Sequence, residues 1–403
     1  MELRLACRIK GAINTILREW RDLWPGGLSK DQYSTLNLIA HCREGSLGSN
    51  LASCDKCHHQ QWYASSCGDR HCPNCLGPRQ MEWSEKVCRR LPDCPHFHVV
   101  FTVPEQLHEF FEGNYRIAAA ELFGAAAETL KTFQKNNWHM QGGFLGVLHT
   151  WGSSLNWHPH LHMLVAAGGA DLTSGCWKEA RANYLFPVRA MSQVFRAIFL
   201  RRLEELDAQS GIAWPDELDT VEARRSWRLR LATRNWNIFS RATLGNTRSV
   251  VRYLARYTSR IAISNHRIIR VDSNNRSVTF SWTDYRNNAR KTETTLSGQQ
   301  FLRSFTRHLV PKGFRRVRYF GLLVGDKERL RSIPGSPQTS IHEDAPPTPH
   351  PPCPRCGNPN WTFHSFYQHP TPPIALSKLT QGFTSSSPQG RNRFSLDPPA
   401  MAP

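Results

Sequence analysis

Residues 158–165 read HPHLHMLV, a run in which histidines alternate with other residues before the sequence becomes wholly apolar. On a β-strand alternate side chains share a face, so His160 and His162 point the same way while Leu161 points into the opposite layer. Two imidazoles on one strand face can bind a single cation. We therefore expect His160 and His162 to be metal ligands, and the alternative is a half-buried polar strand face without a metal.

A third ligand for this site is not determined by the sequence. His158 has the same parity as the other two histidines, although Pro159 can bend the chain, and Asn156 is close in sequence. Both remain candidates. Hard cations prefer oxygen ligands, so two imidazoles together with substrate phosphate oxygens favour manganese over magnesium by ligand type.

The segments on either side predict an α+β domain with an antiparallel sheet. Strands are expected at 97–103, 143–151, 158–167, 266–271, 277–282 and 317–322. Helices are expected at 115–136, 188–206, 220–240 and 250–261, and a further helix from the Ser297/Gln300 capping box to residue 308. The short Gly152-Ser153-Ser154 connection makes strands 143–151 and 158–167 a hairpin. This order of elements is typical of an antiparallel sheet with packed helices.

The expected helix at 250–261 carries the second chemical motif. Tyr253 and Tyr257 are four residues apart and so lie on one helical face, with Arg256 and Arg260 each three residues after a tyrosine. Guanidinium groups favour phenolate over phenol and bind phosphate oxygens. A tyrosine that attacks a DNA phosphodiester keeps the bond energy in a phosphotyrosine, so a strand can be rejoined. The alternative is an aromatic pair that packs in the core.

Cysteines are concentrated near the N-terminus: the chain has twelve, and nine of them fall between Cys7 and Cys94. The knuckles Cys54–Cys57 and Cys72–Cys75 have the spacing of a tetrahedral zinc site, which we expect them to form together. Further ligand candidates at lower weight are Cys42, Cys67 and His71, and His41 and His58 can also bind metal. These residues permit a second zinc ion or a different choice of ligands. A third knuckle, Cys353–Cys356, has no second cysteine pair nearby; His364 or His369 could complete it, but we expect it to be unoccupied.

The composition favours a polyanionic partner, because the formal net charge is +19 and Phe, Trp and Tyr number 20, 13 and 9. Residues 314–320 alternate aromatic and basic side chains, which suits single-stranded DNA bound by Arg315, Arg316 and Arg318. The basic stretch 224–234 has a solvated helix face as an equal alternative. Without a signal peptide or an apolar run of membrane length, a cytoplasmic, nucleoid-associated protein without a membrane partner is expected.

Three regions differ in composition. Residues 1–95 are predicted to be a helical, zinc-binding domain, and residues 96–330 the catalytic domain with a helical insertion at about 177–245. Residues 331–403 hold 16 of the 26 prolines and are predicted to be a largely disordered tail with a lone knuckle.

Several motifs in the same order resemble the rolling-circle insertion-sequence transposases, and more narrowly the insertion-sequence ninety-one family. The similar stretches are residues 67–75, 96–104, 158–168, 253–267 and 309–314. The resemblance implies an HUH endonuclease-like catalytic domain behind a small zinc-binding domain. It also implies Tyr253 and Tyr257 as nucleophiles, and His160 and His162 as ligands of Mg²⁺ or Mn²⁺.

By this resemblance the protein would cleave and rejoin single-stranded DNA at element ends through 5′-phosphotyrosine intermediates, driving rolling-circle transposition. Zn²⁺ would be structural, and no small-molecule cofactor is expected. Ser259 stands where many relatives have a histidine. Other functions remain open: a replication initiator or relaxase-like nicking enzyme, a non-catalytic zinc-finger DNA-binding protein, or a zinc hydrolase using His160 and His162. The oligomeric state is not determined.

Overall fold

The computed structural model describes residues 11–181, 183–243, 251, 262–284, 287–325, 328–337 and 351–367, with 78–80 and 365–367 described by backbone alone. The expected helix 250–261 lies outside the described residues except for Val251. Tyr253, Tyr257, Arg256 and Arg260 therefore lie outside them as well. Among the residues that are described, none of the helices combines the length and apolar character needed to cross a membrane.

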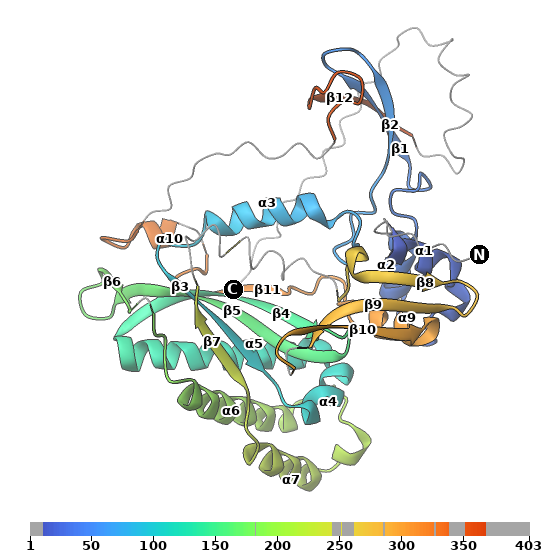
Figure 1. The fold of residues 1–403 in the computed structure, drawn as a ribbon. Coiled ribbons are helices and arrows are strands. Elements are labelled where there is room, and N and C mark those ends of the chain that lie inside the picture. The colour runs from blue at the N-terminus through green and yellow to red at the C-terminus, as the bar shows by residue number, and fades with distance from the viewer. Residues whose placement is uncertain are drawn as a thin grey trace.

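A six-stranded sheet forms the centre of the described structure, with the order β11-β4-β5-β3-β7 and β6 paired to β5 (Figure 1). The neighbouring strands are antiparallel. Their bounds are β3 His96–Thr102, β4 Met140–Trp151, β5 Trp157–Asp171, β6 Trp177–Glu179, β7 Ile238–Ala242 and β11 Val317–Gly321. The expected hairpin is β4–β5, and its register places His149 opposite His160 and Val147 opposite His162. The predicted α+β class with an antiparallel sheet is confirmed.

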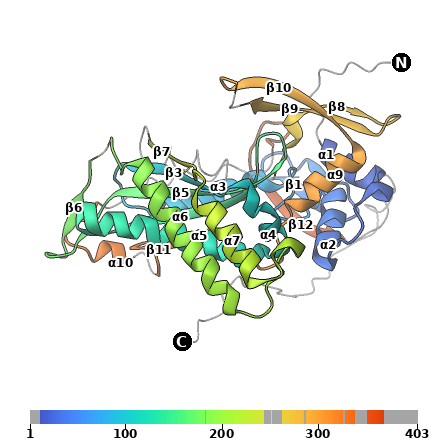
Figure 2. The same ribbon diagram turned by 90° about the horizontal axis from the view of Figure 1, so that it is seen from below.

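One face of this sheet is covered by helices (Figure 2). These are α4 His108–Gly113, α5 Tyr115–Phe133, α6 Val188–Glu205 and α7 Val221–Ala232, with short turns η2 Glu105–Leu107, η3 Gln134–Trp138, η4 Leu206–Ala208 and η5 Asp216–Leu218. The main core lies between the helices and this face, where β5 contributes Leu161, Met163 and Val165. Alternation along β5 therefore puts its histidines on the other face.

The opposite face of the sheet packs against α3 Leu76–Cys88, which lies across it in Figure 1. A smaller apolar cluster there contains Val87, Leu91, Leu145, Val147, Leu164, Val251 and Leu323. Leu164 and Val147 lie on the same face of the sheet as the histidines of β5. Because Val251 belongs to the same cluster, it also lies on the histidine side of the sheet.

The stretch expected as one helix at 220–240 divides into two elements. The helix α7 begins at its Thr220 cap and ends at Ala232, and β7 then pairs with β3. Trp236 between them is buried against Phe195 and Phe199 of α6, which fixes the turn. Residues 238–242 pair with the backbone of β3 instead of continuing the helix. Pairing within the sheet therefore overrides the helical pattern of the sequence.

The N-terminal helices do not form a separate core. The helices α1 Ala12–Glu19 and α2 Lys30–Ala40 share one hydrophobic cluster with β8 Ile268–Asp272, β9 Ser277–Asp284 and α9 Gly298–Arg307. Strand β10 Arg290–Ser297, which the sequence pattern did not predict, completes the sheet β10-β9-β8. The predicted Ser297 capping box is confirmed, since Gln300 N donates to Ser297 Oγ at 3.3 Å and Ser297 N donates to Gln300 Oε1 at 3.1 Å.

A third sheet joins two ends of the sequence. Strand β12 Trp361–Tyr367 pairs with β1 Ser49–Cys54, which pairs in turn with β2 Gln60–Ala64. Figure 1 shows this red strand against the blue hairpin, away from the central sheet. The tail predicted to be largely disordered therefore contains a segment with defined structure, residues 351–367. The turn η6 Asn265–Arg267, η1 Arg21–Leu23 and the short α10 Glu328–Arg331 complete the described elements.

Candidate functional site

Three histidines meet on the α3-facing side of the central sheet. His149 comes from β4, and His160 and His162 come from β5; their ligand-capable nitrogens all lie within 4.8 Å of one another. The antiparallel register makes this happen, because His149 lies directly opposite His160 and one step diagonally from His162. The two expected ligands therefore do share a face, and the structure adds a third imidazole.

Hydrogen bonds determine which nitrogen of His160 is available. Its Nδ1 lies 2.7 Å from the carbonyl oxygen of His158, so Nδ1 carries the proton and donates it. In the neutral ring Nε2 then has a lone pair. That atom lies 3.1 Å from Nε2 of His162.

His162 is oriented in the same manner from its other side. Its Nδ1 lies 2.8 Å from Nε2 of His98 on β3, and the two rings are stacked at 9°. When His162 Nδ1 donates to His98, the Nε2 lone pairs of His160 and His162 face each other. Two ligands at right angles around a metal, each about 2.1 Å from it, would be about 3 Å apart. The spacing of the two Nε2 atoms fits a divalent ion held by these rings.

The electrostatics favour neutral imidazoles. Burial lowers the pKa of His160 to about 4, and the neighbouring His158 adds to the effect. Burial lowers the pKa of His162 well below its ordinary value, and the charge of the neighbouring His149 is the next largest cause. Because metal binding requires the unprotonated ring, all of this prepares the cluster for a cation at neutral pH.

The two candidates for a third ligand are placed elsewhere. His158 has the expected parity, but it contributes its carbonyl to His160, and its ring contacts those of His160 and His108. Asn156 accepts a hydrogen bond from Ser154 Oγ at 2.8 Å in the hairpin loop. His149 was not among the predicted ligands. Aligning the two strands of the predicted hairpin residue by residue would have placed it opposite His160.

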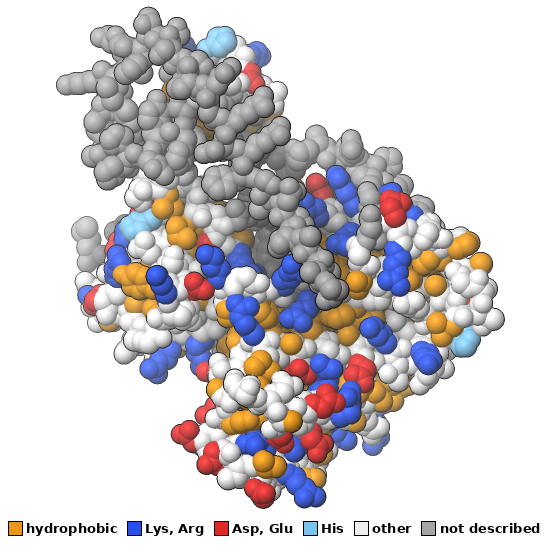
Figure 3. Space-filling view, turned by 180° about the vertical axis from the view of Figure 1, so that it is seen from behind, with side chains coloured by type: hydrophobic (Ala, Val, Ile, Leu, Met, Phe, Trp, Pro, Cys, Tyr) orange, Lys and Arg blue, Asp and Glu red, His pale blue; other side chains and the backbone are white. Residues whose placement is uncertain are grey.

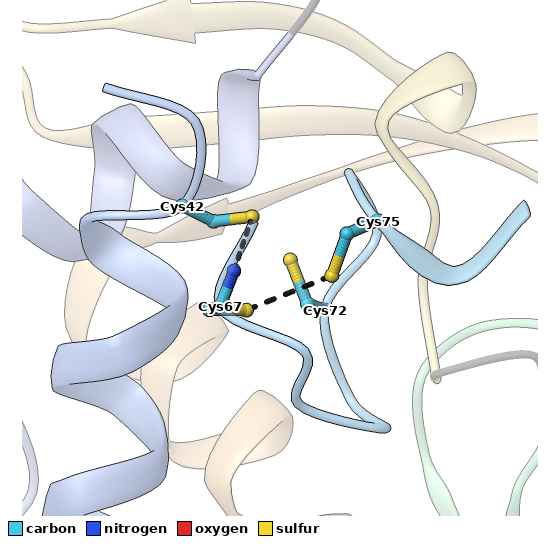
Figure 4. A group of neighbouring side chains, drawn as sticks. All are labelled: Cys42, Cys67, Cys72 and Cys75. Atoms are coloured by element: carbon cyan, nitrogen blue, oxygen red, sulfur yellow. Dashed lines mark hydrogen bonds between the residues drawn. The ribbon is translucent and has the colours of Figure 1, made fainter. Parts of the chain in front are cut away.

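The cysteines form two clusters and not the single site expected from spacing. Cys42, Cys67, Cys72 and Cys75 lie together where α2 ends and α3 begins (Figure 4). Cys67 Sγ lies 3.7 Å from Cys75 Sγ, and the backbone N–H of Cys67 donates to Cys42 Sγ at 3.4 Å. A tetrahedral zinc site with Zn–S bonds of about 2.3 Å has S–S edges of about 3.8 Å, so the geometry fits zinc.

The expected pairing of Cys54–Cys57 with Cys72–Cys75 is therefore wrong. Cys54 and Cys57 lie with Cys353 and Cys356, all four ligand atoms being within 4.8 Å. The reason is the β1–β2 hairpin, which carries Cys54 and Cys57 at its turn, while Cys72 and Cys75 stay at the start of α3. The knuckle expected to be lone has a partner.

His71, a lower-weight metal candidate, has a different role. Its Nδ1 donates to Asp69 Oδ1 at 2.9 Å, and its Nε2 accepts from the N–H of Val310 at 3.1 Å. Burial lowers its pKa, which keeps the ring neutral for this arrangement. Next to it, Arg70 donates to the carbonyls of Phe314 and Pro311 at 2.6 and 2.8 Å. The loop between Cys67 and Cys72 is thus bonded to the segment that leads into β11.

The three arginines expected to bind DNA differ in exposure. Arg315 is exposed, and Arg318 is half-buried with its guanidinium 4.4 Å from the centre of the Phe123 ring. Arg316 is buried, and burial lowers its pKa to about 10. A surface contact between Arg316 and a phosphate is therefore incompatible with the structure, because alternate residues of this segment face the interior.

Charge on the surface is unevenly distributed. Figure 3 shows acidic side chains gathered at the lower end, where α6 and α7 lie, and Lys and Arg side chains spread across the middle. In the basic stretch 224–234, Arg224 and Arg228 each contact Asp207 at 2.7 Å. These two arginines are therefore paired within the helical insertion.

Comparison with known proteins identifies the family. Residues 143–330 match the family model described as "Putative transposase", and residues 12–103 match the one described as "Transposase zinc-binding domain". The chain is 36% identical over 311 residues to "Putative transposase y4qJ" of Sinorhizobium fredii, covering 76% of this chain and 77% of that protein. The chain belongs to the insertion-sequence ninety-one family of transposases.

A second relative agrees with this assignment. The transposase is 34% identical over 305 residues to "Transposase for insertion sequence element IS801" of Pseudomonas savastanoi pv. phaseolicola, covering 74% of this chain and 72% of that protein. Among solved structures, a metal-bound conjugative relaxase TrwC in complex with oriT DNA aligns with 41% of this chain and 71% of that one, at 12% identity and a TM-score of 0.23. Membership of the transposase family means that the protein acts on DNA, and the match over residues 12–103 marks a zinc-binding domain.

Proposed function

We propose that this transposase cuts and rejoins single-stranded DNA at the ends of its element through 5′-phosphotyrosine intermediates, with rolling-circle transposition as the outcome. Tyr253 and Tyr257 are the nucleophiles. His149, His160 and His162 hold Mg²⁺ or Mn²⁺ in an HUH endonuclease-like site. The proposal depends chiefly on one observation: three imidazoles converge on one sheet face with two Nε2 atoms 3.1 Å apart.

The bound ion would withdraw charge from the scissile phosphate and orient it. The chain's own groups do the remaining work. A tyrosine Oη bonds to phosphorus as the phenol proton leaves, the P–O3′ bond breaks, and the departing 3′ oxygen takes up a proton. Arg256 and Arg260, by their spacing, neutralise phosphate oxygens and favour phenolate. A second tyrosine permits a second transfer before the first strand end is released.

The position of Val251 supports this assignment. It is fully buried in the cluster that contains Val147 and Leu164, on the same sheet face as His149 and His162. Val251, two residues before Tyr253 in the sequence, therefore lies on the sheet face that carries the histidine cluster.

For the N-terminal region we propose that Cys42, Cys67, Cys72 and Cys75 hold a structural zinc ion. Its effect is to fix the loop that carries Arg70 and His71 against residues 310–314. Arg315 and Arg318, adjacent to Phe314 and Phe123, are proposed to bind the DNA strand.

Covalent capture tests the proposed chemistry. The protein is incubated with single-stranded DNA from the element end and Mn²⁺ or Mg²⁺, and denaturing gels are used to detect a protein–DNA adduct. We expect the adduct from wild type and from the matched control Tyr184→Phe, whose ring is exposed at 52%. We expect none from the Tyr253→Phe/Tyr257→Phe double variant or from His160→Ala.

The alternatives give different results in this experiment. Cleavage that persists in the double tyrosine variant would indicate a hydrolase. DNA binding without cleavage by wild type would indicate a non-catalytic protein. Nicking that is never followed by joining of an element end to a second DNA would favour a replication initiator or a relaxase-like enzyme.

A further inference from the structure

The small sheet β12-β1-β2 is stabilised by very few buried side chains. In residues 49–64 and 351–364, the described side chains that are buried are Ala52, Cys54 and Cys353. Two of these three are cysteines of the cluster formed by Cys54, Cys57, Cys353 and Cys356. Three strands without an apolar core are not stable in water unless something else links them.

The sulfur positions in this cluster fit a metal. Cys54 Sγ lies 3.5 Å from Cys356 Sγ, and Cys57 Sγ lies 3.6 Å from Cys353 Sγ. Both separations are close to the edge of about 3.8 Å in a tetrahedral zinc–thiolate site. They exceed the disulfide bond length of about 2.05 Å.

The two knuckles also share one backbone geometry, although they are far apart in sequence. In the first, Cys54 N donates to His59 O at 2.9 Å and His58 N donates to Cys54 O at 2.9 Å. In the second, Cys353 N donates to Asn358 O and Gly357 N donates to Cys353 O, both at 2.8 Å.

The fourth residue after the first cysteine is left-handed in both knuckles, with φ 55° at His58 and 72° at Gly357. This tight turn brings both sulfurs of a Cys-x-x-Cys knuckle to one side. A non-glycine residue in this conformation carries a strain that persists only where its surroundings impose it.

Other contacts bind the same two segments together. Thr362 Oγ1 donates to Asp55 Oδ1 at 2.7 Å, and Asp55 N donates to Asn360 O at 3.3 Å. The ring of Trp361 lies 5.7 Å from that of Tyr63 in an edge contact. These contacts are mostly exposed, so they supplement a metal and do not replace it.

We propose that Cys54, Cys57, Cys353 and Cys356 bind a second zinc ion, which joins the C-terminal segment 351–367 to the β1–β2 hairpin. The site is discontinuous, since Cys54 and Cys356 are 302 residues apart. Folding of β12 therefore depends on metal, and the zinc-binding part of this chain extends beyond the N-terminal region. This proposal is independent of the tyrosine chemistry.

Zinc content of the full-length chain tests the proposal. Mass spectrometric elemental analysis of protein purified under reducing conditions is expected to find two zinc ions per chain. Cys353→Ser/Cys356→Ser and Cys42→Ser/Cys67→Ser are each expected to retain one. The control Cys176→Ser, whose thiol is exposed and outside both clusters, is expected to retain two.

Hydrogen exchange separates local from global effects. In Cys353→Ser/Cys356→Ser, amides of 49–54 and 361–367 are expected to exchange faster, while those of 140–171 remain unchanged. Cys353→His, which keeps a ligand, is expected to restore the second zinc ion and the slow exchange. The proposal would be overturned by any of three results. These are one zinc ion in the wild-type protein, two zinc ions in Cys353→Ser/Cys356→Ser, or a Cys54–Cys356 disulfide in the wild-type protein.

Discussion

His98 is the residue through which the proposed metal site can be weakened without changing any of its proposed ligands. Its Nε2 lies 2.8 Å from Nδ1 of His162, and its ring stacks on that ring. His98→Phe keeps a ring of similar size and removes the acceptor. His162 then loses the interaction that keeps its proton on Nδ1 and its Nε2 lone pair directed toward His160.

The expected cost follows from the role of such partners in other metal sites. Loss of a hydrogen bond to a ligating histidine lowers metal affinity by about 10- to 100-fold, which corresponds to about 1.4–2.8 kcal/mol. Because the imidazoles remain, saturating Mn²⁺ is expected to restore adduct formation. The defect should thus be in the concentration of metal required and not in the maximal rate.

Calorimetric titration with Mn²⁺ and a metal-dependence curve of adduct formation measure this effect. His96→Phe is the matched control, because His96 lies on the same strand and face two residues earlier and is also buried. We expect it to bind Mn²⁺ like wild type. Wild-type affinity in a folded His98→Phe variant would refute the orienting role of His98.

Three further outcomes are expected. His149→Ala should weaken Mn²⁺ binding more than His98→Phe does, since a ligand is lost; an unchanged titration would exclude His149 from the site. His308→Gln should remove a pH dependence of stability. Burial lowers the pKa of His308 to about 4, so its contribution is complete above about pH 6.5 and is lost as pH falls toward 4. Between pH 7.5 and 5, the free energy of unfolding measured in urea should fall by about 2 kcal/mol less in His308→Gln than in wild type. An equal fall in both proteins would contradict this. Arg70→Ala should cost about 2–4 kcal/mol in urea unfolding, because two charge-assisted hydrogen bonds are lost; exposed Arg315→Ala should stay within about 0.5 kcal/mol, and equal costs would refute the docking role.

Local patterns predicted much of the central sheet. Alternation in residues 158–165 placed His160 and His162 on one face and Leu161 in the main core, as observed. The Ser297 capping box located the start of α9. Both predictions depend on neighbouring residues alone, so the sequence contains all that is needed for them.

Predictions failed where distant segments compete. The helical pattern at 220–240 continues past Ala232, but β3 offers a free edge, and residues 238–242 join it. His149 required the register of the β4–β5 hairpin as well as its existence, because a shift of one residue would turn its ring to the other face. The tyrosine helix itself remains a prediction.

The zinc site predicted from cysteine spacing was wrong for a related reason. Cys54–Cys57 and Cys72–Cys75 have the spacing of one zinc site, and nothing local contradicts that pairing. The knuckle that lies beside the first one begins at Cys353, in the region predicted to be a largely disordered tail. Sequence proximity is a weak guide to metal ligands whenever a hairpin moves one knuckle away from the other.

The zinc-binding region and the histidine cluster are connected through a short series of backbone contacts. Arg70, in the loop between Cys67 and Cys72, binds the carbonyls of Pro311 and Phe314. Two residues later, the carbonyl of Arg316 accepts from the N–H of Leu148 at 2.9 Å, next to His149. Since the ligand nitrogens must be placed within a few tenths of an ångström, a loop held by four thiolates provides rigidity that this edge of the sheet would otherwise lack. In the proposed function, the zinc-binding region would thus support the histidine cluster mechanically in addition to any DNA contact.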